Sequence, residues 1–251
     1  MRGSPTYSSP ALLLIAHGSR DPRHAATVEA LAGRLRLLRP SAEIATAYLE
    51  HCAPRVPQVV GRLDGAAVAV PLLLGRAFHA KSDIPAALRA AGADLPLADV
   101  LGPSPLLLDA LDRRLAETGL DVRSAAVRAR TGVVLAAAGS SDRTANATTR
   151  AVAAEWQRTR GWAAVEVAYA SAAPPQVPDA VSALRARGIA RVAVAPYLLA
   201  PGVLPDRIAD AAGDADIVAP VLGAAPEIAR LLLQRYDQAR LAVPAAPALS
   251  A

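Results

Sequence analysis

The sequence has one cysteine, one lysine and few aromatic residues, and these shortages exclude several classes of protein. A single cysteine, Cys52, excludes an internal disulfide and a cysteine-based zinc cluster. No apolar stretch reaches about 18 residues without a charge or a helix breaker, so no transmembrane helix is predicted. The first residues lack the long apolar region and the cleavage site of a signal peptide. These absences predict a soluble cytoplasmic protein without a membrane partner.

The charge balance favours a small anionic substrate over nucleic acid. The 251 residues carry a formal net charge of +5, but the arginines are dispersed along helical faces. Aromatic residues make up only 3% of the chain, so side chains for stacking on bases are scarce. A positive balance of this size also attracts small anions. We therefore expect no nucleic-acid partner.

Aliphatic residues, in contrast, are abundant. Hydrophobic residues make up 53% of the chain, mainly Ala, Val, Leu and Ile, which suits parallel strands covered by helices. Asp21 and Pro22 are a cap and first-turn residue for a helix over 21–38. Alternation of strands and helices predicts an α/β fold with helices on both faces of a parallel sheet. In the first half the predicted strands are 11–18, 43–50, 66–74 and 97–102, and further helices are predicted at 54–63, from 84, and over 104–118.

The order of elements then repeats. Gly139 lies 121 residues after Gly18, and two further matched segments keep the same spacing, which indicates an internal duplication. The matched pairs are "ALLLIAHGSRDPR" with "GVVLAAAGSSDRT", "AYLEHCAPRVP" with "AYASAAPPQVP", and "VLGPSP" with "VLGAAP". We predict an N-terminal domain over 1–122, a degenerate repeat over 123–241 and a disordered tail over 242–251. A duplicated chain of this kind is expected to be a monomer.

The two halves differ where chemistry would be placed. Three polar residues of the first half are replaced in the second, and the pairs are His17 and Ala138, Glu50 and Ser171, and His79 and Leu204. Taken singly, each polar residue is also explained as a strand-end histidine, a solvated carboxylate or a loop histidine. His17 and Glu50 end predicted parallel strands and His79 lies in the loop after a third, so the three can converge on the rim formed by the carboxyl ends of the strands. Two imidazoles and a carboxylate suit a borderline divalent ion such as Fe, Co, Ni or Zn.

Three nearby residues receive lesser roles. His24 falls on the polar side of the predicted first helix and is expected at the surface. His51 would point away from Glu50 if the strand continued, so at most it would support a ligand. Cys52 is expected to be a small buried residue and not a ligand.

At these residues the sequence resembles the small type II tetrapyrrole chelatases, namely the sirohydrochlorin cobaltochelatases and ferrochelatases. "LLLIAHGSRDP", "AYLEHCAP" and "VPLLLGRAFHAKSDIP" carry the resemblance, which extends over nearly the whole chain. It implies that His17, Glu50 and His79 bind the metal and assist its insertion into the macrocycle. One departure is Phe78, where relatives often have glycine; this ring is expected to pack on the macrocycle or to anchor the loop.

Insertion requires a proton acceptor near neutral pH and donors for a carboxylate-rich substrate. For the substrate we name Ser19, Arg20, Arg76, Phe78 and Lys81, while each of the three basic side chains is equally explained as solvated surface. The divalent metal (Fe²⁺, Co²⁺ or Ni²⁺) is a substrate, and no organic cofactor is expected. A non-catalytic tetrapyrrole or metal carrier using the same cleft is the alternative. A phosphate-binding module is disfavoured because neither GxGxxG nor GxxxxGK[ST] occurs.

Overall fold

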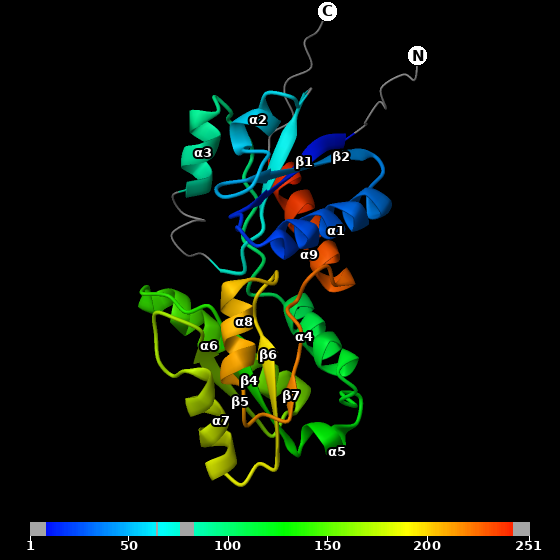
Figure 1. The fold of residues 1–251 in the computed structure, drawn as a ribbon. Helices are drawn as coiled ribbons and strands as arrows, with labels where there is room; N and C mark the ends of the chain where they lie inside the picture. Colours follow the sequence, from blue (N-terminus) through cyan, green and yellow to red (C-terminus); the bar gives the residue numbers. More distant parts are fainter. Residues whose placement is uncertain (1–8, 64, 76–82, 243–251) are drawn as a thin grey trace, which may run out of the picture.

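Two parallel β-sheets lie one above the other, and the second repeats the strand arrangement of the first with one strand added (Figure 1). This computed structural model describes residues 9–63, 65–75 and 83–242. The strand order is β2-β1-β3 in the first sheet and β5-β4-β6-β7 in the second, and every pairing is parallel. The strands are β1 (Ser9–Ala16), β2 (Ala42–Tyr48), β3 (Ala67–Pro71), β4 (Thr131–Ala137), β5 (Ala164–Tyr169), β6 (Arg191–Pro196) and β7 (Ile217–Val218).

The helices cover the faces of both sheets, as the sequence predicted. They are α1 (Pro22–Leu38), α2 (Val56–Val60), α3 (Ile84–Ala90), α4 (Pro105–Glu117), α5 (Ala125–Arg128), α6 (Arg143–Arg160), α7 (Val177–Ala186), α8 (Val203–Ala211) and α9 (Pro226–Leu241). Asp21 caps α1 through the backbone N–H of Arg23, and Asp142 caps α6 through that of Thr144. Among the described residues, no helix is both long and apolar enough to cross a membrane.

The duplication extends to backbone conformation. Gly18 and Gly139, which are 121 residues apart, have φ of 96° and 85°. His51 and Ala172, separated by the same interval, both have φ of 61°. Few non-glycine residues adopt positive φ, so its recurrence at matched positions shows that the two halves share one backbone plan.

The last helix of each half packs against the other half. Helix α4 contacts β6, and the indole Nε1 of Trp156 in α6 donates to Asp112 of α4 at 2.9 Å. Helix α9 contacts α1 and β3, and the Tyr236 hydroxyl donates to the carbonyl of Pro10 at 2.6 Å. Figure 1 shows α9 beside β1 and α1, and α4 beside the second sheet. Packing between the two halves therefore crosses the boundary predicted at residue 122.

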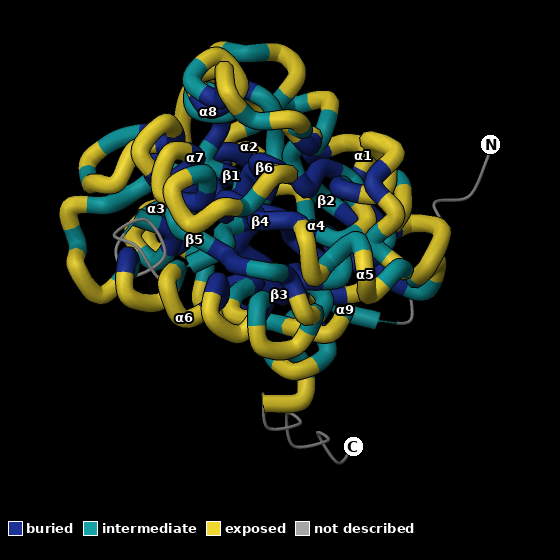
Figure 2. The backbone as a smooth tube through the Cα atoms, turned by 90° about the horizontal axis from the view of Figure 1, so that it is seen from below, coloured by how far each residue is buried: buried dark blue, intermediate teal, exposed yellow. Residues whose placement is uncertain are grey.

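The exchange of helices joins the cores of the two halves. Buried side chains from β1, α1, α4, β4, α6 and α9 belong to one continuous hydrophobic cluster. Figure 2 shows buried residues along the central strands and exposed residues on the outer helices. Burial of this continuous apolar surface fixes the two sheets relative to each other.

The predicted strand at 97–102 is wrong. Only an isolated parallel bridge forms there, between Ala69 and Leu97. Beyond it, Arg235 of α9 donates to the carbonyl of Val100 at 2.8 Å and to that of Leu101 at 3.1 Å. These two carbonyls therefore bind the exchanged helix.

Candidate active site

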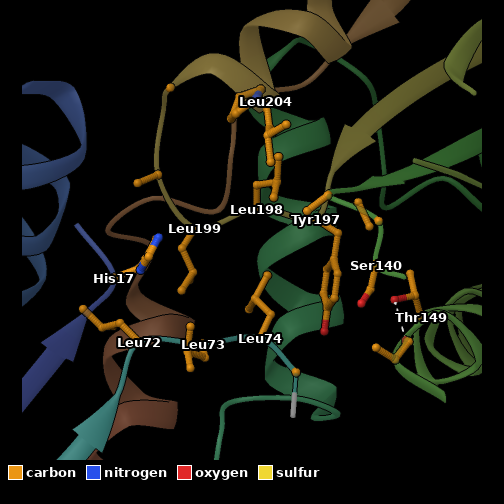
Figure 3. A pocket seen from close by; sticks show the side chains of 18 of the residues that line it. His17, Leu72, Leu73, Leu74, Ser140, Thr149, Tyr197, Leu198, Leu199 and Leu204 are labelled. Carbon is orange, nitrogen blue, oxygen red and sulfur yellow. Dashed lines mark hydrogen bonds between the residues drawn. The ribbon is translucent and has the colours of Figure 1, made fainter. Parts of the chain in front are cut away.

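A cleft of about 810 Å³ lies between the carboxyl ends of the two sheets (Figure 3). The first half contributes the segments that follow β1 and β3, together with His24 of α1. The second half contributes the segments after β4 and β6, one side of α6 and the start of α8. Figure 3 shows leucines on both sides of the cleft, with His17 among them. The second half is thus a wall of the site, although it lacks the predicted metal ligands.

Gly18 explains how the chain delivers His17 to this cleft. A Cβ at Gly18 would lie 1.8 Å from the Glu50 carbonyl oxygen, so only glycine permits the approach. The Glu50 backbone N–H donates to the His17 carbonyl at 2.8 Å. The tight turn after β1 therefore places the histidine beside the segment that follows β2.

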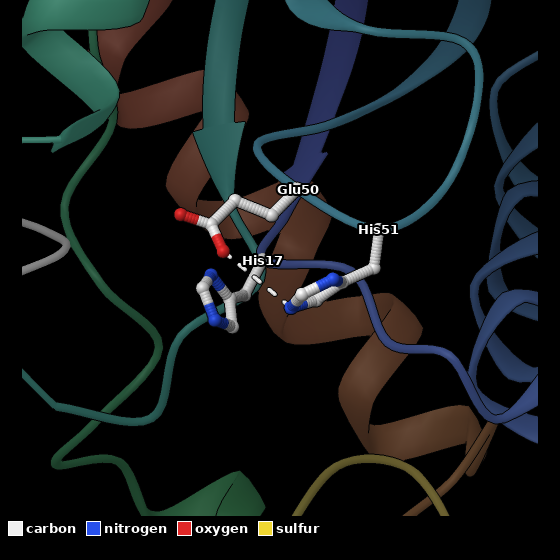
Figure 4. A group of neighbouring side chains, drawn as sticks. All are labelled: His17, Glu50 and His51. Atoms are coloured by element: carbon white, nitrogen blue, oxygen red, sulfur yellow. Dashed lines mark ion pairs between the residues drawn. The ribbon is translucent and has the colours of Figure 1, made fainter.

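His17, Glu50 and His51 converge at this point (Figure 4). One potential ligand atom from each lies within 4.8 Å of the other two. His51 Nε2 is 3.4 Å from a carboxylate oxygen of Glu50, and the two imidazole rings are 6.1 Å apart, edge to face. The group can hold a borderline divalent ion and leaves coordination positions open.

The expectation that His51 points away from Glu50 is wrong. It assumed that the strand continues, but β2 ends at Tyr48 and His51 adopts a positive φ of 61°. Side chains therefore no longer alternate between faces at this point. The proline-containing run that starts at Pro54 is a sequence signal for a turn here and could have identified His51.

Cys52 holds the turn in place. Its thiol donates to the Ser19 carbonyl at 3.0 Å, and the Ser19 N–H donates to its sulfur at 3.4 Å. In the second half, Asn146 bonds the same backbone groups of Ser140, accepting at 3.1 Å and donating at 2.7 Å. The Ser19 hydroxyl accepts from the Asp21 N–H at 3.1 Å, so this predicted substrate ligand also holds the cap residue of α1.

His24 does not lie on the open surface as predicted. It is half-buried and lines the cleft, because the second half covers the first turn of α1. Burial lowers the pKa of its imidazole, and the nearby His17 lowers it further. Within the described structure its buried Nδ1 has no hydrogen-bond partner. This neutral imidazole on the cleft wall was missed by the sequence analysis.

Of the remaining predicted site residues, some lie within the described part of the chain and the others lie outside it. Arg20 is exposed on the loop before α1. Leu204, the counterpart of His79, lines the cleft at the start of α8 (Figure 3). The other four predicted residues, His79, Arg76, Phe78 and Lys81, lie outside the described residues.

Fold and site together define a duplicated α/β protein with an open group of potential metal ligands at one pair of strand ends. The family model described as CbiX matches the chain twice, over residues 11–118 and 132–239. The chain therefore belongs to the CbiX family.

Two curated relatives come from Priestia megaterium. A sirohydrochlorin cobaltochelatase is 29% identical over 213 residues, covering 79% of this chain and 67% of the relative. A sirohydrochlorin ferrochelatase is 29% identical over 209 residues, covering 79% and 76%. Among solved structures, SirB from Bacillus subtilis with Fe³⁺ has a TM-score of 0.77 at 21% identity, covering 92% of this chain and 95% of SirB. This structural likeness shows the shared fold.

Proposed function

We propose that the protein is a sirohydrochlorin chelatase, which inserts Fe²⁺ or Co²⁺ into a carboxylate-rich tetrapyrrole during sirohaem or cobalamin biosynthesis. The observation that carries the proposal is the His17–Glu50–His51 group at the edge of an 810 Å³ cleft. That volume is in the range of about 300–1,000 Å³ typical of small-molecule sites. The names of the curated relatives support the same reaction class.

The donor set suits a metal that must be released. Metal insertion transfers the ion to four pyrrole nitrogens, so a ligand set that leaves positions open is an advantage. Glu50 and His51 are both exposed, and only His17 is half-buried. The ion can therefore arrive from solvent on the Glu50 and His51 side, while His17 presents it to the macrocycle. His79 is proposed as a further ligand on the strength of the internal repeat and the family resemblance.

Insertion also releases two pyrrole protons. A neutral imidazole accepts protons near pH 7, which few other side chains do. His17 and His24 both line the cleft, and the lowered pKa of His24 keeps its ring neutral at that pH. We assign metal binding to His17. Proton acceptance then falls to His24, the imidazole that does not hold the metal. The leucines that line the cleft pack against the faces of the macrocycle.

The test is the rate of metal insertion into sirohydrochlorin, followed by the change in its absorption spectrum. The purified protein is expected to accelerate insertion of Co²⁺ or Fe²⁺ above the enzyme-free rate. Ni²⁺ is tested in parallel because the same ligands bind all three ions. Binding of the macrocycle with no acceleration for any of the three metals would identify a carrier instead of an enzyme.

A further inference from the structure

An ion pair joins the two halves at the rim of the cleft. Arg23 lies in the first turn of α1 and Asp206 in α8 of the other half. Arg23 Nη2 is 2.5 Å from Asp206 Oδ2, and Nη1 is 3.3 Å from Oδ1. The chain neighbours His24 and Pro205 both line the cleft. The pair therefore lies directly beside the lining of the cleft, where α1 faces α8.

Arg23 is shared between two carboxylates. Its Nε lies 3.0 Å from each carboxylate oxygen of Asp21, in addition to its contacts with Asp206. Asp21 also caps α1 through the Arg23 backbone N–H at 2.9 Å, so its position is fixed by the helix. In the described structure, the Asp206 carboxylate accepts hydrogen bonds from Arg23 alone. Asp206 is thus the carboxylate that can leave without disturbing a helix cap.

The pair is also accessible to an incoming anion. The side chains of Arg23 and Asp206 are 52% and 51% exposed. Exposed ion pairs contribute little to stability, so a competing carboxylate can replace one partner. The planar guanidinium binds any carboxylate through two parallel N–H groups. Asp206 therefore offers Arg23 the same chemistry as a carboxylate of the ligand would.

We propose that Arg23 is a substrate-binding residue whose carboxylate site is occupied by Asp206 until the macrocycle arrives. A carboxylate side arm of the tetrapyrrole displaces Asp206 from Arg23, and Arg23 then fixes the orientation of the ring in the cleft. This inference rests on the proposed function, because it takes a polycarboxylate tetrapyrrole as the ligand.

The test compares dissociation constants of metal-free sirohydrochlorin, measured by absorption titration of the full-length protein. Asp206→Asn removes the competing charge and is expected to tighten binding about two- to fivefold, the range that an exposed ion pair supports. Arg23→Gln is expected to weaken binding about three- to tenfold, because a charge-assisted bond to the ligand is lost. Melting curves confirm that each variant is folded.

Glu166→Gln is the matched control. Glu166 pairs with Arg187 at 2.6 Å, with side chains 38% and 50% exposed, and unlike Arg23 and Asp206 neither residue has a chain neighbour that lines the cleft. This variant changes the net charge as Asp206→Asn does, and its affinity is expected to equal that of the wild type. If Asp206→Asn binds no more tightly than Glu166→Gln, the ion pair is structural and the inference is overturned. A wild-type protein that binds no macrocycle would instead overturn the proposed function.

Discussion

Replacing Gly18 with alanine should separate folding from metal binding, because the chain contains its own control. An alanine at φ of 96° carries a backbone cost of about 1–2 kcal/mol. Its Cβ would also lie 1.8 Å from the Glu50 carbonyl oxygen, where side-chain carbons are essentially never closer than 3.0 Å. The Glu50 segment must therefore move by more than 1 Å.

The movement has two consequences. It breaks the hydrogen bond from the Glu50 N–H to the His17 carbonyl, now 2.8 Å, at about 1 kcal/mol. With the backbone cost, the total is about 2–3 kcal/mol, which lowers the melting temperature by about 4–12 °C in a chain of this length. It also moves Glu50 and His51 away from His17, so Co²⁺ affinity should fall at least about tenfold.

Gly139→Ala is the control in the other half. Its Cβ would lie 1.9 Å from the Ser171 carbonyl oxygen, and its φ of 85° is equally unfavourable. The loss of stability should match that of Gly18→Ala, but Co²⁺ affinity should stay at the wild-type value. Thermal melts by circular dichroism and calorimetric Co²⁺ titration without macrocycle measure the two quantities. Equal metal affinity in the two glycine variants would refute the assignment of the metal ligands to the first half.

Two further predictions concern the residues that support the site and the exchanged helices. Cys52→Ala removes the thiol hydrogen bonds to Ser19 and should cost about 1 kcal/mol, seen as a drop of about 2–4 °C in melting temperature, while Co²⁺ affinity measured by titration stays within twofold of the wild type. Glu227→Gln should destabilise the protein by about 1–3 kcal/mol at pH 7, because Arg113 of α4 bonds this buried carboxylate at 2.7 Å and lowers its pKa. Because the pKa is lowered, the ion pair stabilises the protein at pH values above the ordinary pKa of 4.5. The difference in melting temperature between wild type and variant should therefore shrink below that pH. A difference that stays constant from pH 7 to 3 would contradict the ion pair.

The sequence predicted the parallel α/β architecture because local patterns determine it. Apolar runs of strand length, Asp21 as a cap and the interval of 121 residues between Gly18 and Gly139 are all visible without a structure. The convergence of His17 and Glu50 was also predictable, since the carboxyl ends of neighbouring parallel strands meet at one edge. Their proximity is confirmed by the structure.

What the sequence did not predict depends on contacts between distant segments. At the predicted strand 97–102, the carbonyls of Val100 and Leu101 accept from Arg235, a residue more than 130 positions later. The exchange of α4 and α9 leaves the order of elements unchanged, so the repeat does not reveal it. His24 lines a cleft only because the second half covers α1, and His51 joins the site because β2 ends early.

The central claim is that the first half supplies the metal for insertion while the second half only encloses the macrocycle. The most direct test is the initial rate of Co²⁺ insertion into sirohydrochlorin by folded His17→Ala and by Ser171→Ala, which alters the counterpart of Glu50. His17→Ala should lose about a hundredfold or more in rate, because presentation of the metal depends on that imidazole. Ser171→Ala should insert at the wild-type rate. Wild-type insertion by His17→Ala would contradict the claim.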